Sequence, residues 1–248
     1  MPRYKLTLEY DGTPFVGWQR QDNGPSVQEA LEKAVFALCG EKADICGAGR
    51  TDAGVHALAM VAHLEIARVF PDGVIRDALN HHMLPSPVSV LQVETVEEDF
   101  HARFSCVRRA YEYRIINRRA RLAIDLNRAW HIPYALDSDA MDAAAQVLVG
   151  KHDFTTFRAT ACQSASPVKT LDEISVRRAG DDVIVRCAAR SFLHNQVRSF
   201  VGSLVEVGRG KWRAQDLKDA LLACDRSACG QVAPAHGLYF LRADYEKN

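Results

Sequence analysis

The first half of the chain switches between the two-residue period of a strand and the longer period of a helix. Residues 4–10 alternate apolar and polar side chains, which predicts a strand with one buried face. Ser26 and Glu29 have the spacing of a capping box, and apolar residues recur at helical spacing over 27–38 until Gly40. Further along the first half we expect a strand at 58–66, a helix at 72–81 and a strand at 88–96.

The second half of the chain repeats this order in outline. Tyr111, Tyr113 and Ile115 share one face of an expected strand, because alternate strand residues point the same way. The Ala-Gly-Asp-Asp sequence at 179–182 is typical of a hairpin turn. The elements expected in this half are strands at 170–178, 182–190 and 238–244 and helices from Asp137 or Ser138 to Gly150, at 193–207 and at 214–223.

This order of strands and helices predicts an α+β fold of two similar α+β units with largely antiparallel sheets. We expect an N-terminal domain of residues 1–105 and a C-terminal domain of residues 106–248, with an active-site cleft between them. No low-complexity linker separates the two halves, so the two sheets can be continuous.

The composition is that of an ordinary globular protein. Of the 248 residues 48% are hydrophobic and 25% are charged, which excludes intrinsic disorder. The most apolar stretch, residues 58–70, is interrupted by His63, Glu65 and Arg68 and is therefore no membrane span. The first residues lack the apolar segment of a secretory signal. These features predict a cytoplasmic protein with no membrane partner.

Cysteines and histidines are scattered along the chain. An odd number of cysteines without a C-x-x-C pair indicates reduced thiols and not a disulfide framework. Cys224, Cys229 and His236 come nearest to a metal cluster, but their spacing matches no standard zinc pattern. We therefore expect no bound metal.

The net charge of zero hides an uneven distribution. Residues 1–100 carry eight lysines and arginines against fifteen acids, and seven arginines against one acid lie within 101–121. Arginines suit bidentate contact with phosphates, and Arg103, Arg108 and Arg109 are candidate nucleic-acid contacts in this band. The tyrosines of the same strand fit base stacking. A solvated strand edge with half-buried aromatic residues explains the same pattern.

The loop of residues 47–57 concentrates glycines, Arg50, Asp52 and His56 without any hydrophobic period. A dinucleotide fingerprint requires a glycine where Asp52 stands, and a phosphate loop requires a Gly-Lys-Ser/Thr ending that is absent. The loop therefore presents Asp52 as a candidate reactive group. The alternative is a structural loop in which the aspartate caps the next element.

Arg198 lies beside the apolar stripe of an expected helix, one turn before Gly202. The glycine allows another segment to pack closely against the helix. An arginine near an apolar face requires a carboxylate partner, and Asp52 is a candidate for it. The alternative is an arginine whose head group reaches solvent.

Together these segments resemble the tRNA pseudouridine synthase A family, and the resemblance covers almost the whole chain. The similar segments, in chain order, are Tyr10–Gln19, Arg50–Ala57, Phe100–Ser105, the pair Tyr111 and Tyr113, His152–Phe154, Phe192–Arg198 and Ala233–Leu238. Gln196 departs from the family pattern, in which methionine is more frequent at that position.

The resemblance implies a cytoplasmic homodimer that isomerises uridine to pseudouridine at positions 38, 39 and 40 of the tRNA anticodon stem-loop. It implies that Asp52 is the catalytic nucleophile or base, that Arg198 is its ion-pair partner and that Tyr111 stacks on the flipped base. Arg50 and Leu238 lie in the same motifs and are candidate substrate contacts, with Arg103, Arg108 and Arg109.

The residue chemistry agrees with this reaction. Substrate and product contain the same atoms, so the reaction needs no redox cofactor. Breaking the bond between sugar and base requires one ionised carboxylate as a nucleophile or base. Two other classes remain open from the residues alone: an RNA-binding module, in which Asp52 has no role, and a nucleotide-dependent enzyme, which the incomplete glycine motif argues against.

Overall fold

The computed structural model describes residues 1–246 and divides the chain into two compact units. The first unit is Met1–Val107 together with the chain from Tyr239 onward, and the second is Arg108–Leu238. The chain enters the second unit along strand β5 (Cys106–Asn117) and leaves it at the start of strand β10 (Leu238–Tyr245). The last strand therefore folds with the N-terminal part of the chain.

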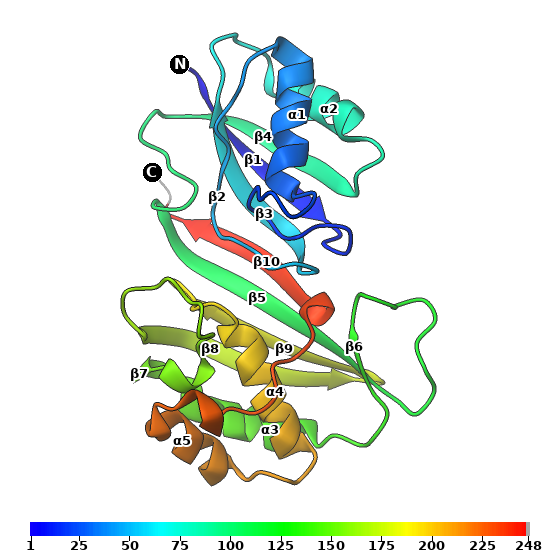
Figure 1. Cartoon of the computed structure of the whole chain (residues 1–248), viewed down its shortest axis with the longest axis vertical. Helices are drawn as coiled ribbons and strands as arrows, with labels where there is room; N and C mark the ends of the chain where they lie inside the picture. The colour runs from blue at the N-terminus through cyan, green and yellow to red at the C-terminus, as the bar shows by residue number, and fades with distance from the viewer. Residues whose placement is uncertain (247–248) are drawn as a thin grey trace. The chain divides into compact units, whose positions relative to one another are not determined.

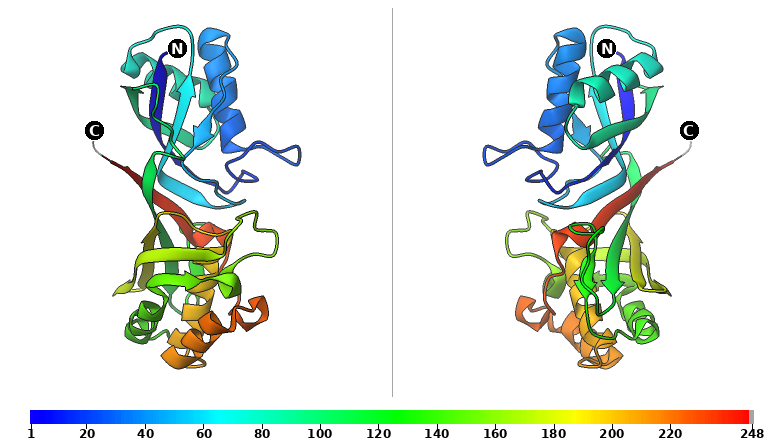
Figure 2. Two further views of the ribbon diagram at one scale, coloured as in Figure 1. Left: turned by 90° about the vertical axis from the view of Figure 1, so that its left-hand side faces the viewer. Right: turned by 90° about the vertical axis from the view of Figure 1, so that its right-hand side faces the viewer.

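The first unit is a sheet covered by two helices (Figure 1). Its strands β1 (Arg3–Tyr10), β3 (His56–Glu65), β4 (Val88–Val96) and β10 are ordered β4-β1-β3-β10, and the short β2 (Cys46–Gly47) pairs with β3. All these pairs are antiparallel except that of β10 with β3. Helices α1 (Val27–Cys39) and α2 (Asp72–Met83) pack side by side on this sheet (Figure 2).

Local sequence signals account for the limits of α1. The Ser26 hydroxyl accepts a hydrogen bond from the Glu29 N–H at 3.2 Å, as the capping box predicts. Gly40 ends the helix with a φ of 77°, in the left-handed region that glycine adopts without steric cost. Val27, Leu31 and Val35 are buried, so the apolar stripe faces the sheet.

The second unit combines an antiparallel sheet with three helices. Its strands β7 (Gly150–Asp153), β8 (Val168–Ala179) and β9 (Asp182–Ala189) follow β5 in the order β5-β9-β8-β7, and β6 (Trp130–Ile132) pairs in parallel with β5. The helices are α3 (Ser138–Ala145), α4 (Gln196–Gly208) and α5 (Ala214–Ala223). Phe200 and Leu204 of α4 are fully buried.

The structure confirms the predicted α+β class and the largely antiparallel pairing. Helix α4 begins three residues later than predicted. Asn195, the residue before it, has a φ of 63°, which lies in the left-handed region and is incompatible with a right-handed α-helix. Helix α3 ends at Ala145 and continues only as a 3₁₀ turn, short of the predicted end at Gly150. No helix within residues 1–246 combines the length and apolar character that a membrane crossing requires.

Candidate active site

The loop that carries Asp52 is fixed against the N-terminal segment Tyr10–Gln19 within the first unit. The Trp18 N–H donates to the Thr51 carbonyl at 3.0 Å, and the Tyr10 and Thr51 hydroxyl groups are 2.8 Å apart. Gly17 and Asp52 form an isolated antiparallel bridge. The residues on the N-terminal side of the carboxylate therefore have a defined backbone position.

Glycines allow these two segments to approach at distances that no side chain permits. A Cβ placed on Gly12 would lie 2.0 Å from the Val55 carbonyl oxygen, and one on Gly47 would lie 2.6 Å from the Trp18 ring. Gly54 has a φ of 76°, and the Val55 N–H donates back to the Asp52 carbonyl at 3.1 Å. The glycines of the loop thus serve the contact between chain segments.

The side chains at the tip of this loop differ in exposure. Thr51 and Val55 are buried, Asp52 is half-buried, and Arg50 is exposed. A half-buried carboxylate on a fixed backbone meets the geometric requirement for a nucleophile or a general base, because its approach to a substrate atom is defined.

His56 joins the end of this loop to two other segments of the first unit. The ring is buried, and its Nδ1 accepts a hydrogen bond from the Gly12 N–H at 3.0 Å. The same nitrogen lies 3.2 Å from an Asp11 carboxylate oxygen. The ring stacks on Tyr239 of β10 with 4.8 Å between centroids. Sequence reasoning gave His56 no role, and the structure makes it a fixed point of the loop.

In the second unit, Arg198 lies in the first turn of α4 and is hydrogen-bonded on two sides. Its Nε donates to the Ala233 carbonyl at 2.7 Å, and Nη1 donates to the Asn195 amide oxygen at 2.9 Å. A Cβ placed on Gly202 would lie 1.6 Å from the Gln231 carbonyl oxygen, so the chain at 231–233 lies directly on the helix. The close approach predicted at Gly202 is therefore confirmed.

Gln196, where the family more often has methionine, is buried without loss of hydrogen bonding. Its amide oxygen accepts from the Leu193 N–H at 2.7 Å. The polar side chain therefore satisfies a backbone donor at the start of α4.

The two tyrosines of β5 occupy different environments. Tyr113 is fully buried, and its hydroxyl donates to the Pro234 carbonyl at 2.8 Å. Burial raises the pKa of Tyr113 well above its usual value, although the nearby charge of Arg198 opposes this shift. Tyr111 is half-buried, and its ring packs edge-on against Phe192 at 5.1 Å. Of the two, Tyr111 is the one whose ring is partly accessible.

The predicted arginine contacts do not form a uniform surface. Arg103 is exposed in the first unit. Arg108 is paired with Glu173 at 2.9 Å and Asp172 at 3.6 Å in the second unit. Arg109 is only 9% exposed and donates to the Arg190 carbonyl at 2.6 Å. Leu238 is buried at the start of β10.

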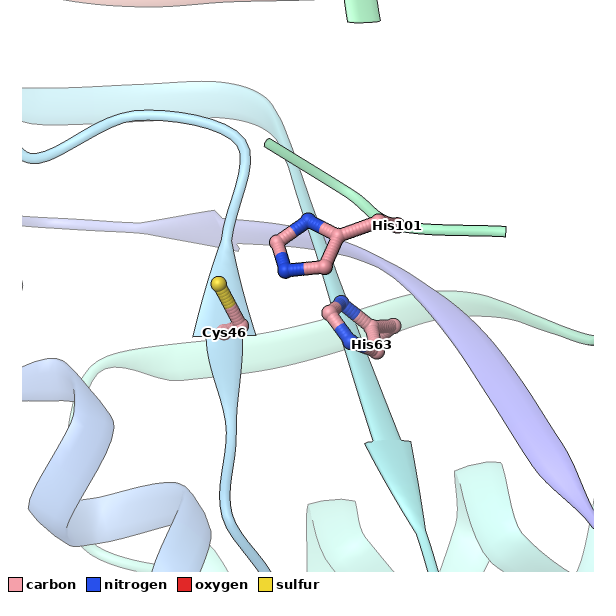
Figure 3. Close-up of side chains that lie close together, drawn as sticks. All are labelled: Cys46, His63 and His101. Atoms are coloured by element: carbon pink, nitrogen blue, oxygen red, sulfur yellow. The ribbon is translucent and has the colours of Figure 1, made fainter. Parts of the chain in front are cut away.

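One cluster of potential metal ligands, which sequence reasoning missed, lies in the first unit. Among residues 1–246, Cys46, His63 and His101 offer three ligand atoms within 4.8 Å of one another (Figure 3). However, Nδ1 of His63 accepts from the Ala102 N–H, and Nδ1 of His101 accepts from two backbone N–H groups. A ligating histidine normally donates from its second nitrogen, so this arrangement fits hydrogen bonding better than metal binding.

Cys224, Cys229 and His236, whose spacing in the sequence matches no standard zinc pattern, are not part of that cluster. Cys224 is exposed, and the Cys229 thiol lies 3.7 Å from the Ser203 hydroxyl. The described chain therefore does not bring these three side chains together as a ligand set.

Comparisons with known proteins identify the family. Residues 7–105 and 144–246 match the family model described as tRNA pseudouridine synthase. Over 99% of its length the chain is 61% identical to the whole tRNA pseudouridine synthase A of Rhodopseudomonas palustris. It is 63% identical to the corresponding protein of Nitrobacter winogradskyi, of which it covers 96%, and 60% identical to that of Maricaulis maris, of which it covers 98%. These matches show that the chain belongs to the tRNA pseudouridine synthase family of isomerases.

Proposed function

We propose that the protein isomerises uridine to pseudouridine at positions 38, 39 and 40 of the tRNA anticodon stem-loop. The observation that carries the proposal is the Asp52 loop, in which a half-buried carboxylate stands on a backbone fixed by the Tyr10–Gln19 segment. The relatives that match over their full length are named tRNA pseudouridine synthase A.

The reaction breaks the bond between the sugar and a base nitrogen, turns the detached uracil and forms a bond from the sugar to a base carbon. The atoms are conserved and no electron acceptor is needed, so a carboxylate without a cofactor suffices. We assign this role to Asp52. Its carboxylate can attack the sugar carbon, attack the base ring or take a proton from the sugar.

We assign Arg198 to the same reaction as the cation that keeps Asp52 ionised. A carboxylate enclosed with a substrate loses water, and a nearby guanidinium compensates the lost solvation. Two hydrogen bonds to Ala233 and Asn195 give the guanidinium a defined direction, which supports this role. Tyr111 is assigned to stacking on the flipped base and to moving a proton through its hydroxyl, and Leu238 to an apolar substrate contact.

The substrate requires further contacts, because extruding a paired uridine costs a few kcal/mol. Salt bridges from arginines to phosphates offset such a cost. We assign these contacts to Arg50 and Arg103 of the first unit and to Arg108 of the second. Arg109, which is almost buried and donates to the Arg190 carbonyl, is assigned to supporting β5 instead. We further propose a cytoplasmic homodimer as the active form, on the basis of the family resemblance.

A product-mapping experiment tests the proposal directly. Unmodified tRNA is incubated with the protein in the presence of a metal chelator and no cofactor, and pseudouridine is mapped by chemical derivatisation. We expect pseudouridine at positions 38, 39 and 40. Pseudouridine only elsewhere in the tRNA would contradict the proposed site, and tRNA binding without any product would favour a binding module.

A further inference from the structure

An exposed aromatic side chain with a cation beside it lies on the turn that joins β4 to β5 in the first unit. Phe104 is 73% exposed, and the Arg103 guanidinium is 5.6 Å from the centroid of its ring. Arg103 is itself exposed. We call residues Phe100–Ser105 the Phe104 turn. An exposed ring with a cation beside it offers a flat face for stacking next to a site for an anion.

Local hydrogen bonds give the Phe104 turn a fixed shape. Nδ1 of His101 accepts from the N–H groups of Arg103 and Phe104, at 3.1 and 3.2 Å. The Ser105 hydroxyl accepts from the His101 N–H at 2.9 Å, and the Ser105 N–H donates to the His101 carbonyl at the same distance. The His101 ring lies 4.3 Å from the Phe104 ring. The aromatic surface is therefore held in place before any ligand binds.

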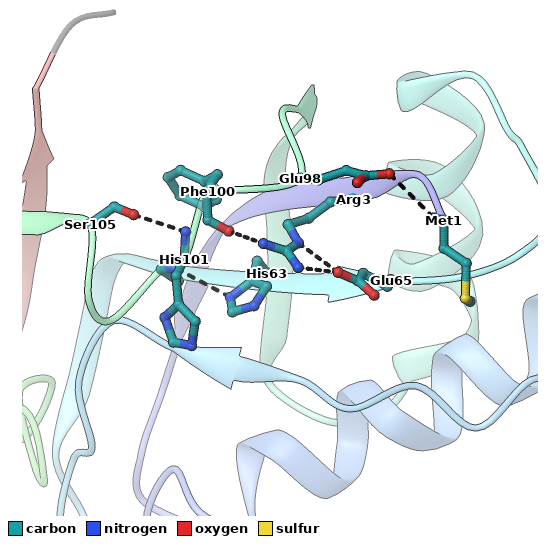
Figure 4. A network of polar contacts seen from close by, with 9 residues as sticks. Met1, Arg3, His63, Glu65, Glu98, Phe100, His101 and Ser105 are labelled. Carbon is teal, nitrogen blue, oxygen red and sulfur yellow. Dashed lines mark hydrogen bonds and ion pairs between the residues drawn. The ribbon is translucent and has the colours of Figure 1, made fainter.

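A second layer of contacts ties the turn to the sheet of the first unit (Figure 4). Nδ1 of His63, on β3, accepts from the Ala102 N–H at 3.2 Å, and Arg3 donates to the Phe100 carbonyl at 2.6 Å. The backbone of Cys46 hydrogen-bonds to the His63 ring. Because Cys46 lies on β2, which leads into the Asp52 loop, His63 connects the turn to that loop.

The Phe104 turn and the Asp52 loop each contribute one exposed arginine to the surface of the first unit, Arg103 and Arg50. Burial and the negative charge of Asp44 raise the pKa of the Cys46 thiol, and the positive charges of Arg103 and Arg50 oppose that shift. Both guanidinium groups therefore act on the same thiol. Of the two arginines, Arg103 places its cation beside the exposed Phe104 ring.

We propose that the Phe104 turn binds an unpaired nucleotide of the substrate tRNA, with its base stacked on Phe104 and its phosphates near Arg103 and Arg50. The inference rests on the proposed function, because it names how the first unit holds the substrate RNA. Flat rings flanked by arginines suit single-stranded RNA, whose bases are free to stack and whose phosphates are anionic. An unpaired nucleotide has a base face free for stacking and is therefore the natural ligand.

Binding of tRNA to three substitutions at one position tests the stacking. In the Asp52→Asn background, which is expected to bind tRNA without turnover, Phe104→Ala is expected to raise the Kd for tRNA about tenfold. Phe104→Tyr and Phe104→Trp should retain the affinity, because they retain a flat ring. Val69→Ala is the matched control, since Val69 is 75% exposed in the same unit, and it should leave the Kd unchanged.

Two further readouts separate stacking from a structural effect. The fluorescence of Phe104→Trp should fall on addition of tRNA, with a midpoint at the Kd, beyond any change in the parent protein. In the otherwise native enzyme, Phe104→Ala should raise KM about tenfold and leave kcat unchanged, as expected for a contact made equally before and during reaction.

Three results would overturn the inference: an unchanged Kd in Phe104→Ala, a fluorescence unaffected by tRNA in Phe104→Trp, or a Phe104→Ala chain that changes its assembly state in sedimentation without changing its Kd. The last result would assign the ring to contact with a second copy. Failure of the proposed function is seen separately, as missing pseudouridine with the native enzyme, whatever the affinity of the Phe104 variants.

Discussion

The Asp52 loop of the first unit and the Arg198 region of the second are built by different means. In the loop, hydrogen bonds join backbone to backbone and close packing occurs at glycines, so the chain is fixed and the carboxylate is carried on it. In the second region, the side chains themselves are held: Arg198 by Ala233 and Asn195, and Tyr113 by Pro234. The difference matches the proposed roles, in which the loop presents the reactive carboxylate and the second region fixes the direction of a cation and of aromatic rings.

Apart from loss of the Asp52 carboxylate, the largest effect that sharpens this comparison is expected at Tyr111. Tyr111→Phe keeps the ring and removes the hydroxyl, so kcat should fall about a hundredfold if that hydroxyl moves a proton. The Kd for tRNA should stay within about twofold. Tyr113→Phe is the paired control: it loses the hydrogen bond to Pro234, costs about 1 kcal/mol of stability and leaves kcat unchanged. Full activity in Tyr111→Phe would leave stacking as the only role.

A smaller effect is expected from Arg198→Lys. Lysine keeps the positive charge but does not reproduce both planar hydrogen bonds, to Ala233 and to Asn195. We expect kcat to fall about tenfold, the equivalent of one lost hydrogen bond of about 1.4 kcal/mol. Single-turnover rates measure it. Equal rates for the two side chains would show that charge alone matters at this position.

Much of the fold follows from local sequence signals, and the site follows from them only in part. The capping box at Ser26, the Gly40 stop and the hairpin at 179–182 act over a few residues, and all three are confirmed. Strands β2, β6 and β7 escaped prediction because two to four residues show no alternation. The apolar stripe of α4 predicts a helix that begins at residue 193, because nothing in the stripe reveals the left-handed backbone of Asn195 that delays its start.

The contacts that position the site could not be predicted because they join residues far apart in the chain. His56 meets Gly12, His63 meets Ala102, and Arg198 meets Ala233. The segment around each of these residues does not identify the distant residue that it contacts. Gly12 and Gly202 are the sequence features that point to these contacts. A glycine indicates that another chain segment can pack closely at that position, but it does not identify the segment.

Two glycines test whether close packing or helix propensity decides stability. Gly202→Ala should destabilise the protein by about 1–3 kcal/mol, because its Cβ would meet the Gln231 carbonyl. Gly73→Ala lies in α2, where a Cβ meets nothing within 4 Å, and should stabilise it by about 0.5–1 kcal/mol. Urea unfolding measures both. A stabilising Gly202→Ala would contradict the packing described for α4.

A small effect is also expected on the pH dependence of stability in the second unit. Burial raises the pKa of Glu112, but hydrogen bonds and charges of Arg114 and Arg186 outweigh it and leave the pKa below its usual value. A lowered folded-state pKa stabilises the protein above the unfolded value near 4.5, and this contribution is lost as the pH falls through the folded pKa. Glu112→Gln should therefore cost about 1 kcal/mol at pH 7. The cost should shrink below about pH 4. A cost that does not vary with pH would contradict the ion-pair explanation.

Turnover by Asp52→Asn, measured beside its tRNA affinity, tests the central claim most directly. The substitution keeps the shape of the side chain and removes the charge, so pseudouridine should fall below detection while the Kd for tRNA stays within about twofold. Asp44→Asn, an exposed carboxylate of the same unit, should leave both unchanged. Substantial pseudouridine formation by Asp52→Asn would show that another group carries the chemistry.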